Sequence, residues 1–183
     1  ECGGDGASIE CWDGSVVCNE SECSDEPVDG FELTIEPTGV SQLIIFQASI
    51  SGLDTGDQIG IFDSEGILNS GDCSSQYGEL LVGPVSEGTW NGDQLALTAI
   101  GSVDNCAFGG FQLPGWVSGN SVVIKVYRSS TGLEYAATAT YSAGTGTFGD
   151  LFMAVSELEL ETGPGPYYNV DKNSFFGKKS LIV

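Results

Sequence analysis

Apolar and polar residues alternate along most of this chain with the period of two that is typical of β-strands. Eight alternating or short apolar runs lie between residues 31 and 160, separated by glycine-rich turns such as DSEG, WNGD and SSTG. The runs are FELTI (31–35), QLIIFQASI (42–50), QIGIF (58–62), ELLVGPV (79–85), QLALTAI (94–100), SVVIKVY (121–127), EYAATATY (134–141) and LFMAVSELEL (151–160). No window combines the 3.6-residue helical period with helix caps. The pattern predicts an all-β fold, an antiparallel β-sandwich of immunoglobulin-like or jelly-roll type.

Two segments that differ from this pattern flank the predicted sandwich. Residues 1–27 are too short and polar to build a core, and they read as a small disulfide-stapled cap. After Glu161 the sequence TGPGP (162–166) cannot extend a central strand, so it reads as a spacer. We therefore divide the chain into an N-terminal cap (1–27), a β-sandwich (28–161), and a Gly/Pro spacer with an extended C-terminal strand (162–183).

The cysteines predict disulfides and hence secretion. The chain has six cysteines and no histidine. They are Cys2, Cys11, Cys18, Cys23, Cys73 and Cys106. A zinc site built from the first four is an alternative, but the spacings lack paired C-x2-C knuckles. We expect two bridges within the first four, in a connectivity that the sequence leaves open, and one between Cys73 and Cys106. This usage and an opening at Glu1 predict a mature secreted protein, extracellular or on the cell surface.

The net charge excludes two classes of partner. With 26 acidic and 5 basic side chains the chain carries −21, which argues against nucleic acid and against anionic membrane surfaces. No apolar run is long enough for membrane insertion. The charge is also uneven, because residues 1–171 carry −24 and the segment KNSFFGKKSLIV (172–183) carries +3.

This basic, apolar segment is the predicted assembly strand. Its principal residues are Phe175, Phe176, Lys178, Lys179, Leu181, Ile182 and Val183. In one interpretation it is the last strand of its own sheet. In the other it is donated to an open sheet edge of a neighbouring copy, as in donor-strand complementation, and opposite charge steers the encounter. We favour donation, because a head-to-tail contact of this kind propagates as a homopolymeric filament.

One stretch resembles a known kind of domain. GLDTGDQIGIFDSEGILNSG (52–71) is similar to the strand-turn-strand pattern GD-x-IG-(V/I)-FD-x-x-G of secreted, surface-associated bacterial proteins, especially in Bacteroidota. The W-x-GD sequence at Trp90–Asp93 and the stretch 122–150 resemble later strands of that domain, so the likeness covers roughly residues 30–160. It implies a β-domain associated with extracellular adhesion and no established catalysis. Cys73, Cys106 and both flanking segments depart from the pattern.

The composition argues against an enzyme and leaves calcium as the one candidate cofactor. Without histidine, Ser-His-Asp and Cys-His arrangements are excluded, and paired cysteines leave no thiol nucleophile. Carboxylates in the turns around one predicted strand suit Ca²⁺, although aspartates are also simply good turn formers. The candidate ligands are Asp54, Asp57, Asp63 and Glu65. No cofactor is required by the structural role that we favour.

Glycans are the remaining predicted partners. Asn19 lies in the chain's one N-x-S/T sequon, so it is the candidate site for an N-linked sugar. Trp116, in the predicted loop LPGWVSGN, is the best candidate for stacking on a sugar, although such rings more often close a core. These residues support the alternative function, a monomeric, calcium-assisted carbohydrate-binding or adhesion module of a secreted surface protein.

Overall fold

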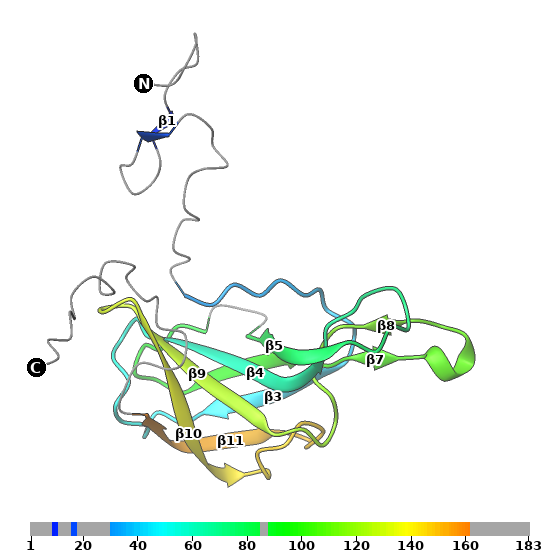
Figure 1. Ribbon diagram of the computed structural model, residues 1–183. Coiled ribbons are helices and arrows are strands. Elements are labelled where there is room, and N and C mark those ends of the chain that lie inside the picture. Colours follow the sequence, from blue (N-terminus) through cyan, green and yellow to red (C-terminus); the bar gives the residue numbers. More distant parts are fainter. Residues whose placement is uncertain (1–8, 11–15, 18–29, 85–87, 162–183) are drawn as a thin grey trace, which may run out of the picture.

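The computed structural model describes residues 9–10, 16–17, 30–84 and 88–161, and Figure 1 draws them as the coloured part of the chain. These residues form strands and one short 3-10 helix, so the all-β prediction is confirmed. The strands are β1 (Ile9–Glu10), β2 (Val16–Val17), β3 (Ser41–Phe46), β4 (Gln58–Ile67), β5 (Tyr77–Gly83), β6 (Leu95–Ile100), β7 (Val103–Asp104), β8 (Gln112–Leu113), β9 (Val122–Arg128), β10 (Leu133–Ala143) and β11 (Met153–Leu160). The 3-10 helix η2 covers Cys106–Phe108.

The prediction of an antiparallel two-sheet sandwich is wrong in its detail. Seven strands form one mixed sheet in the order β5-β4-β9-β10-β11-β3-β6. All neighbours are antiparallel except β3 and β11, which run parallel with Ile44 opposite Met153. The sheet curls into a half-barrel, so that β5 and β6 at its two ends approach each other. A Cβ added to Gly83 of β5 would lie 2.7 Å from the carbonyl oxygen of Thr98 in β6.

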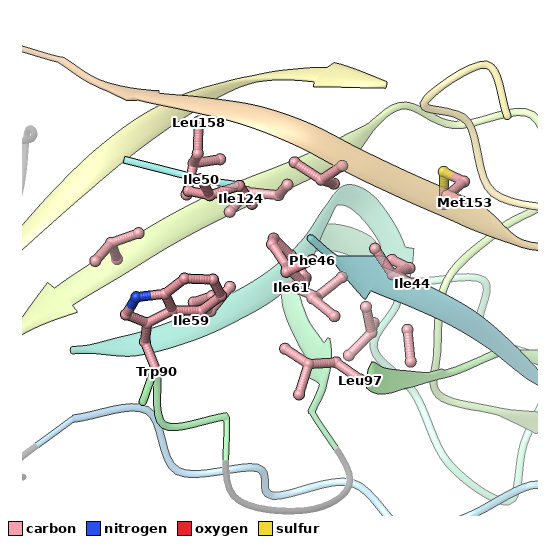
Figure 2. Packing of buried hydrophobic residues seen from close by; sticks show 14 of the residues in the cluster. Ile44, Phe46, Ile50, Ile59, Ile61, Trp90, Leu97, Ile124, Met153 and Leu158 are labelled. Atoms are coloured by element: carbon pink, nitrogen blue, oxygen red, sulfur yellow. The ribbon is translucent and has the colours of Figure 1, made fainter. Parts of the chain in front are cut away.

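The hydrophobic core fills the inside of this curl. Figure 2 shows Ile59 and Ile61 of β4 facing Leu97 of β6 and the side chains of β3. The largest fully buried side chains there include Phe46, Phe148, Ile44, Ile59, Ile61, Leu97, Ile124 and Met153. Each such side chain contributes roughly 1.5–3 kcal/mol on burial. Alternate residues of the central strands supply them, which is the period that the sequence shows.

Seven of the eight predicted strands are present, and the strand predicted at residues 31–35 is absent. Residues 31–37 have no regular secondary structure, bend at Ile35 and belong to no strand ladder among the described residues. Phe31 packs edge-to-face on Phe62, with 5.4 Å between ring centroids, on the face of β4 that points away from the core. Ile35 packs against the core instead. The segment therefore passes from one face of the sheet to the other, and a chain that crosses an edge cannot run along it as a strand.

Several predictions fall outside the described residues. They concern Asn19, the cysteines Cys2, Cys11, Cys18 and Cys23, and the assembly strand 172–183. β11 ends at Leu160. Among the described residues, the structure contains no helix with the length and apolar character needed to cross a bilayer.

Candidate functional site

Asp57, the aspartate of the sequence GD before β4, holds a turn and an arginine. Its side chain is fully buried. The Asp57 Oδ2 atom accepts hydrogen bonds from the Asp54 N–H (2.9 Å) and from Arg128 Nη2 (3.1 Å), while Oδ1 has no partner among the described residues. Asp54 Oδ2 lies 3.5 Å from Arg128 Nη1. Both carboxylates are thus paired with the same guanidinium, which offsets the cost of burying the Asp57 charge.

Asp63, the aspartate of the sequence FD within β4, fastens a distant loop to the sheet. Its side chain is 0% exposed. The carboxylate accepts hydrogen bonds from the Val117 N–H (2.8 Å), from Asn120 Nδ2 (2.9 and 3.1 Å) and from the Glu65 N–H (2.9 Å). These donors satisfy both oxygens and hold residues 117–120 against the end of the strand.

The four predicted calcium ligands therefore lie in two groups. Asp57 and Asp63 are six residues apart on extended chain, a separation of about 20 Å. Asp54 joins the first group, and Glu65 joins the second only through its backbone N–H and carbonyl. Among the described residues, no three acidic or cysteine side chains gather in a way that would hold a metal ion. In this structure the carboxylates of the motif act as hydrogen-bond acceptors that fix turns.

A glycine of the same motif has an equally structural role. A Cβ on Gly60 would lie 2.7 Å from the Phe62 ring and 2.8 Å from the Phe31 ring. Any larger residue at position 60 would therefore prevent the Phe31 ring from packing on β4. The strand-turn-strand pattern thus encodes the folding of β4, and a functional assignment from it needs other support.

Trp116, the candidate for stacking on a sugar, is buried, which favours the alternative that its ring closes the core. The side chain is 8% exposed, and its ring stacks on Phe148 with 5.3 Å between centroids and 3° between planes. Trp116 Nε1 donates to the Ala99 carbonyl at 3.2 Å. The backbone of this stretch is held by bonds from the Trp116 N–H to the Ile100 carbonyl and from the Gly115 N–H to the Ile67 carbonyl. The ring belongs to the core and offers no free face for a sugar.

The predicted disulfide Cys73–Cys106 is confirmed, with 5.9 Å between its Cα atoms. It joins the loop after β4 to η2, between β7 and β8. We call residues 69–76 and 102–113 the disulfide finger, which projects from one end of the sheet in Figure 1. Phe108 in η2 is 90% exposed.

A buried amide network stiffens the disulfide finger. Gln112 is 1% exposed, and its Oε1 atom accepts from Asn69 Nδ2 (3.0 Å) and from the Ser75 N–H (3.1 Å). Its Nε2 atom donates to Asp104 Oδ2 at 2.9 Å. Hydrogen bonds from the Cys106 N–H and from Gln112 lower the pKa of Asp104 below its ordinary value. Neither Gln112 nor Asn69 stands out in the sequence, because amides carry no periodic signal.

The outer face of the sheet, which points away from the core, buries a lysine. Lys125 of β9 is 7% exposed, and its Nζ atom lies 2.6 Å from Glu79 Oε1, 3.3 Å from Glu134 Oε1 and 4.4 Å from the Phe62 ring centroid. Burial lowers the pKa of Lys125, but the hydrogen bond to Glu79 and the charges of Glu134 and Glu79 outweigh it, so the net pKa is raised. Lys125 and Arg128 are the basic residues that precede Lys172, and both are ion-paired.

An apolar groove lies beside the end strand β5. Its volume is about 480 Å³. We call it the β5 groove; its lining residues are 34–38, Leu68, Ser70, Leu80 and 113–114. One wall is the segment 32–36, which bends at Ile35 and whose backbone makes no hydrogen bonds within the described part of the chain. The neighbouring wall is β5, which within the described residues is paired on one side only, with β4. In the described part of the chain, a sheet edge without a partner strand, a segment outside any ladder and apolar surface are thus found together.

Comparisons with known proteins add no assignment to these observations. The chain matches no family model, and comparisons with curated proteins and with solved structures found no match either.

Proposed function

We propose that the protein is a structural subunit of an extracellular filament or surface assembly, which polymerises head-to-tail when segment 172–183 of one copy pairs with the sheet edge of the next. The observation that carries this proposal is that, among the described residues, β5 pairs only with β4 and the neighbouring segment 32–36 belongs to no ladder. Unpaired N–H and C=O groups in a row form a template that a strand from another chain can complete.

The charge distribution supports the same proposal. Lys125 and Arg128 are both bound to carboxylates, so the described surface presents mainly acidic side chains. Such surfaces repel one another, which disfavours unspecific contact between subunit bodies. A segment that carries +3 and no acidic side chain is attracted to them. Repulsion between bodies and attraction of the strand together favour ordered, end-to-end association.

The covalent chemistry fits a role outside the cell. A disulfide that closes a finger of the fold is stable in an oxidising compartment and is rarely kept in a reducing one. We therefore propose secretion, with the assembly formed after export. A single disulfide-containing sheet that curls around one core is a compact unit for such an assembly.

Negative-stain electron microscopy and sedimentation velocity on the purified full chain test the proposal. We expect filaments or a concentration-dependent series of oligomers from the wild-type chain. The double variant Leu181→Asp/Val183→Asp should remain monomeric, because it places charge on the apolar face of the strand. A wild-type chain that stays monomeric at high concentration, or a double variant that assembles as the wild type does, would overturn the proposal.

A further inference from the structure

We infer that the β5 groove is the acceptor for segment 172–183 of a neighbouring copy, and that Glu32 and Glu36 beside it select the donor through Lys178 and Lys179. This inference rests on the proposed function and identifies the edge at which assembly occurs. The partner is therefore a second copy of this chain, recognised by a strand that is apolar at its end and basic just before it.

The apolar part of the donor matches the groove. Ile35 and Leu80, which line the groove, pack against the core, so its floor continues the apolar interior. In an extended strand Leu181 and Val183 are two residues apart and share one face. A groove of about 480 Å³ is of the size that binds a few apolar groups. Two aliphatic side chains of the donor would cover surface that is otherwise left in contact with water.

Backbone hydrogen-bonding groups line the β5 groove on two sides. β5 is hydrogen-bonded to β4 only, and segment 32–36 has no ladder partner among the described residues. A strand inserted between them can bond to either wall. Exposure alternates along the wall segment on either side of its bend, because Phe31, Leu33 and Ile35 are half-buried while Glu32, Thr34 and Glu36 are exposed. This alternation predicted a strand, and the inserted segment would complete one.

Charged side chains on the wall segment and on the donor determine which strand binds in the groove and how it is aligned. Glu36 lines the groove, and Glu32, four residues before it in the same wall segment, is also exposed. The donor carries Lys178 and Lys179 directly before Ser180 and its apolar end. Exposed ion pairs of this kind favour one alignment of the strand and weaken as salt screens them over about 10 Å.

A second opening in the sheet provides a comparison. Beyond Val155, β11 has lost its partner β3, and a space of about 470 Å³ lies there. Serines and the glutamates Glu157 and Glu159 line it, and its one large apolar residue, Leu158, is buried. It offers carboxylates of similar number but hardly any apolar surface. The apolar end of the donor therefore favours the β5 groove.

A charge exchange in the full chain tests the inference. We expect Glu32→Lys/Glu36→Lys to raise the concentration needed for assembly about tenfold, because two exposed ion pairs become repulsive. Lys178→Glu/Lys179→Glu should do the same, and the four substitutions together should restore assembly. The matched control Glu157→Lys/Glu159→Lys makes the same change in net charge and should leave the concentration within about twofold of wild type. Sedimentation velocity at low and at moderate salt measures all four.

The apolar part is tested by Leu68→Lys. Leu68 lines the groove and is 41% exposed, so the fold tolerates the change while the groove gains a charge. Assembly should again weaken about tenfold, with an unaltered circular dichroism spectrum. If the exchanged charges do not restore assembly, or if the Glu157/Glu159 pair weakens it instead, the β5 groove is not the acceptor while strand donation still stands. If no variant in residues 172–183 alters assembly, donation itself is wrong.

Discussion

Substitution of Asp63 by asparagine separates a structural role for this carboxylate from a role as a metal ligand. The two side chains have the same shape, but asparagine keeps only one acceptor oxygen and presents an NH₂ group in place of the other. In the wild-type chain both oxygens accept hydrogen bonds, from the Val117 N–H, Asn120 Nδ2 and the Glu65 N–H. In the variant, at least one backbone N–H must therefore face another donor.

The magnitude follows from the bonds that are lost. A hydrogen bond to a charged acceptor contributes about 1.5–3 kcal/mol, and a buried donor left without an acceptor costs about 1–3 kcal/mol more. Asp63 is fully buried, so water cannot replace the lost acceptor. We expect Asp63→Asn to lower the free energy of unfolding by about 3–5 kcal/mol. For a chain of this length that corresponds to a fall in Tm of roughly 6–20 °C.

Urea denaturation and thermal melting followed by circular dichroism measure the loss. Glu65→Gln is the matched control, since the exposed Glu65 takes part only through its backbone, and it should change stability by less than about 0.5 kcal/mol. Each protein is melted with EDTA and again with millimolar Ca²⁺. We expect calcium to leave the Tm of all three proteins unchanged.

Two results would refute this reasoning. A loss below about 1 kcal/mol in Asp63→Asn would show that the three hydrogen bonds from Val117 and Asn120 do not hold the loop at 117–120. A calcium-dependent rise in wild-type Tm that disappears in both variants would identify the carboxylates as ligands. A site at 100-fold saturation would add about 2.7 kcal/mol, which melting resolves easily.

Three further predictions concern stability. Cys73→Ser/Cys106→Ser should lower the free energy of unfolding by about 3–4 kcal/mol in urea denaturation, because the bridge closes a loop with a sequence separation of 33; a loss below about 1 kcal/mol would contradict this. Gly115→Ala should cost more than about 3 kcal/mol, since its Cβ would lie 2.4 Å from backbone, whereas Gly119→Ala, with positive φ but open space, should cost about 1 kcal/mol; equal losses would be inconsistent with the packing. The pKa of Lys125 is raised in the folded chain, so its positive charge stabilises the fold fully below its ordinary pKa of 10.5. This stabilisation is lost as pH rises through the higher folded pKa. The Tm should therefore fall above about pH 10.5, and it should fall less steeply in Lys125→Met.

The strands were predictable because their signal is local. Seven of eight predicted runs became strands, since alternation of apolar residues reports burial of one face whatever the neighbours are. The Cys73–Cys106 bridge was predictable because four other cysteines cluster far away in the sequence. Strand ends were less predictable. β4 runs to Ile67, beyond the expected residue 62, because a shift in its pairing with β5 between Asp63 and Gly66 lets it continue.

The features that the sequence did not reveal depend on distant partners. Neither the sequence of β3 nor that of β11 indicates that the two strands pair, or that they pair in parallel. This pairing places all seven strands in one mixed sheet where two sheets were expected. Trp116 is buried where Gly115 lets the chain lie against the backbone of Gly101 and Ser102 and where its N–H bonds to the Ile67 carbonyl, from a different part of the sequence. Asp63 likewise finds Asn120 across 57 residues. Turn chemistry predicts loops, but only tertiary contacts decide which loops are buried.

The parallel pair β3–β11 also determines how the sheet bears tension. β3 is the first strand of the sheet along the chain and β11 is the last. A pull applied before Ser41 and after Leu160 draws the two strands past each other, in opposite directions along their length. The bonds across the pair, such as that from the Gln47 N–H to the Val155 carbonyl, then resist in shear and together, whereas an antiparallel hairpin opens one bond at a time. Stretched between its ends, this sheet is loaded in its mechanically strong direction.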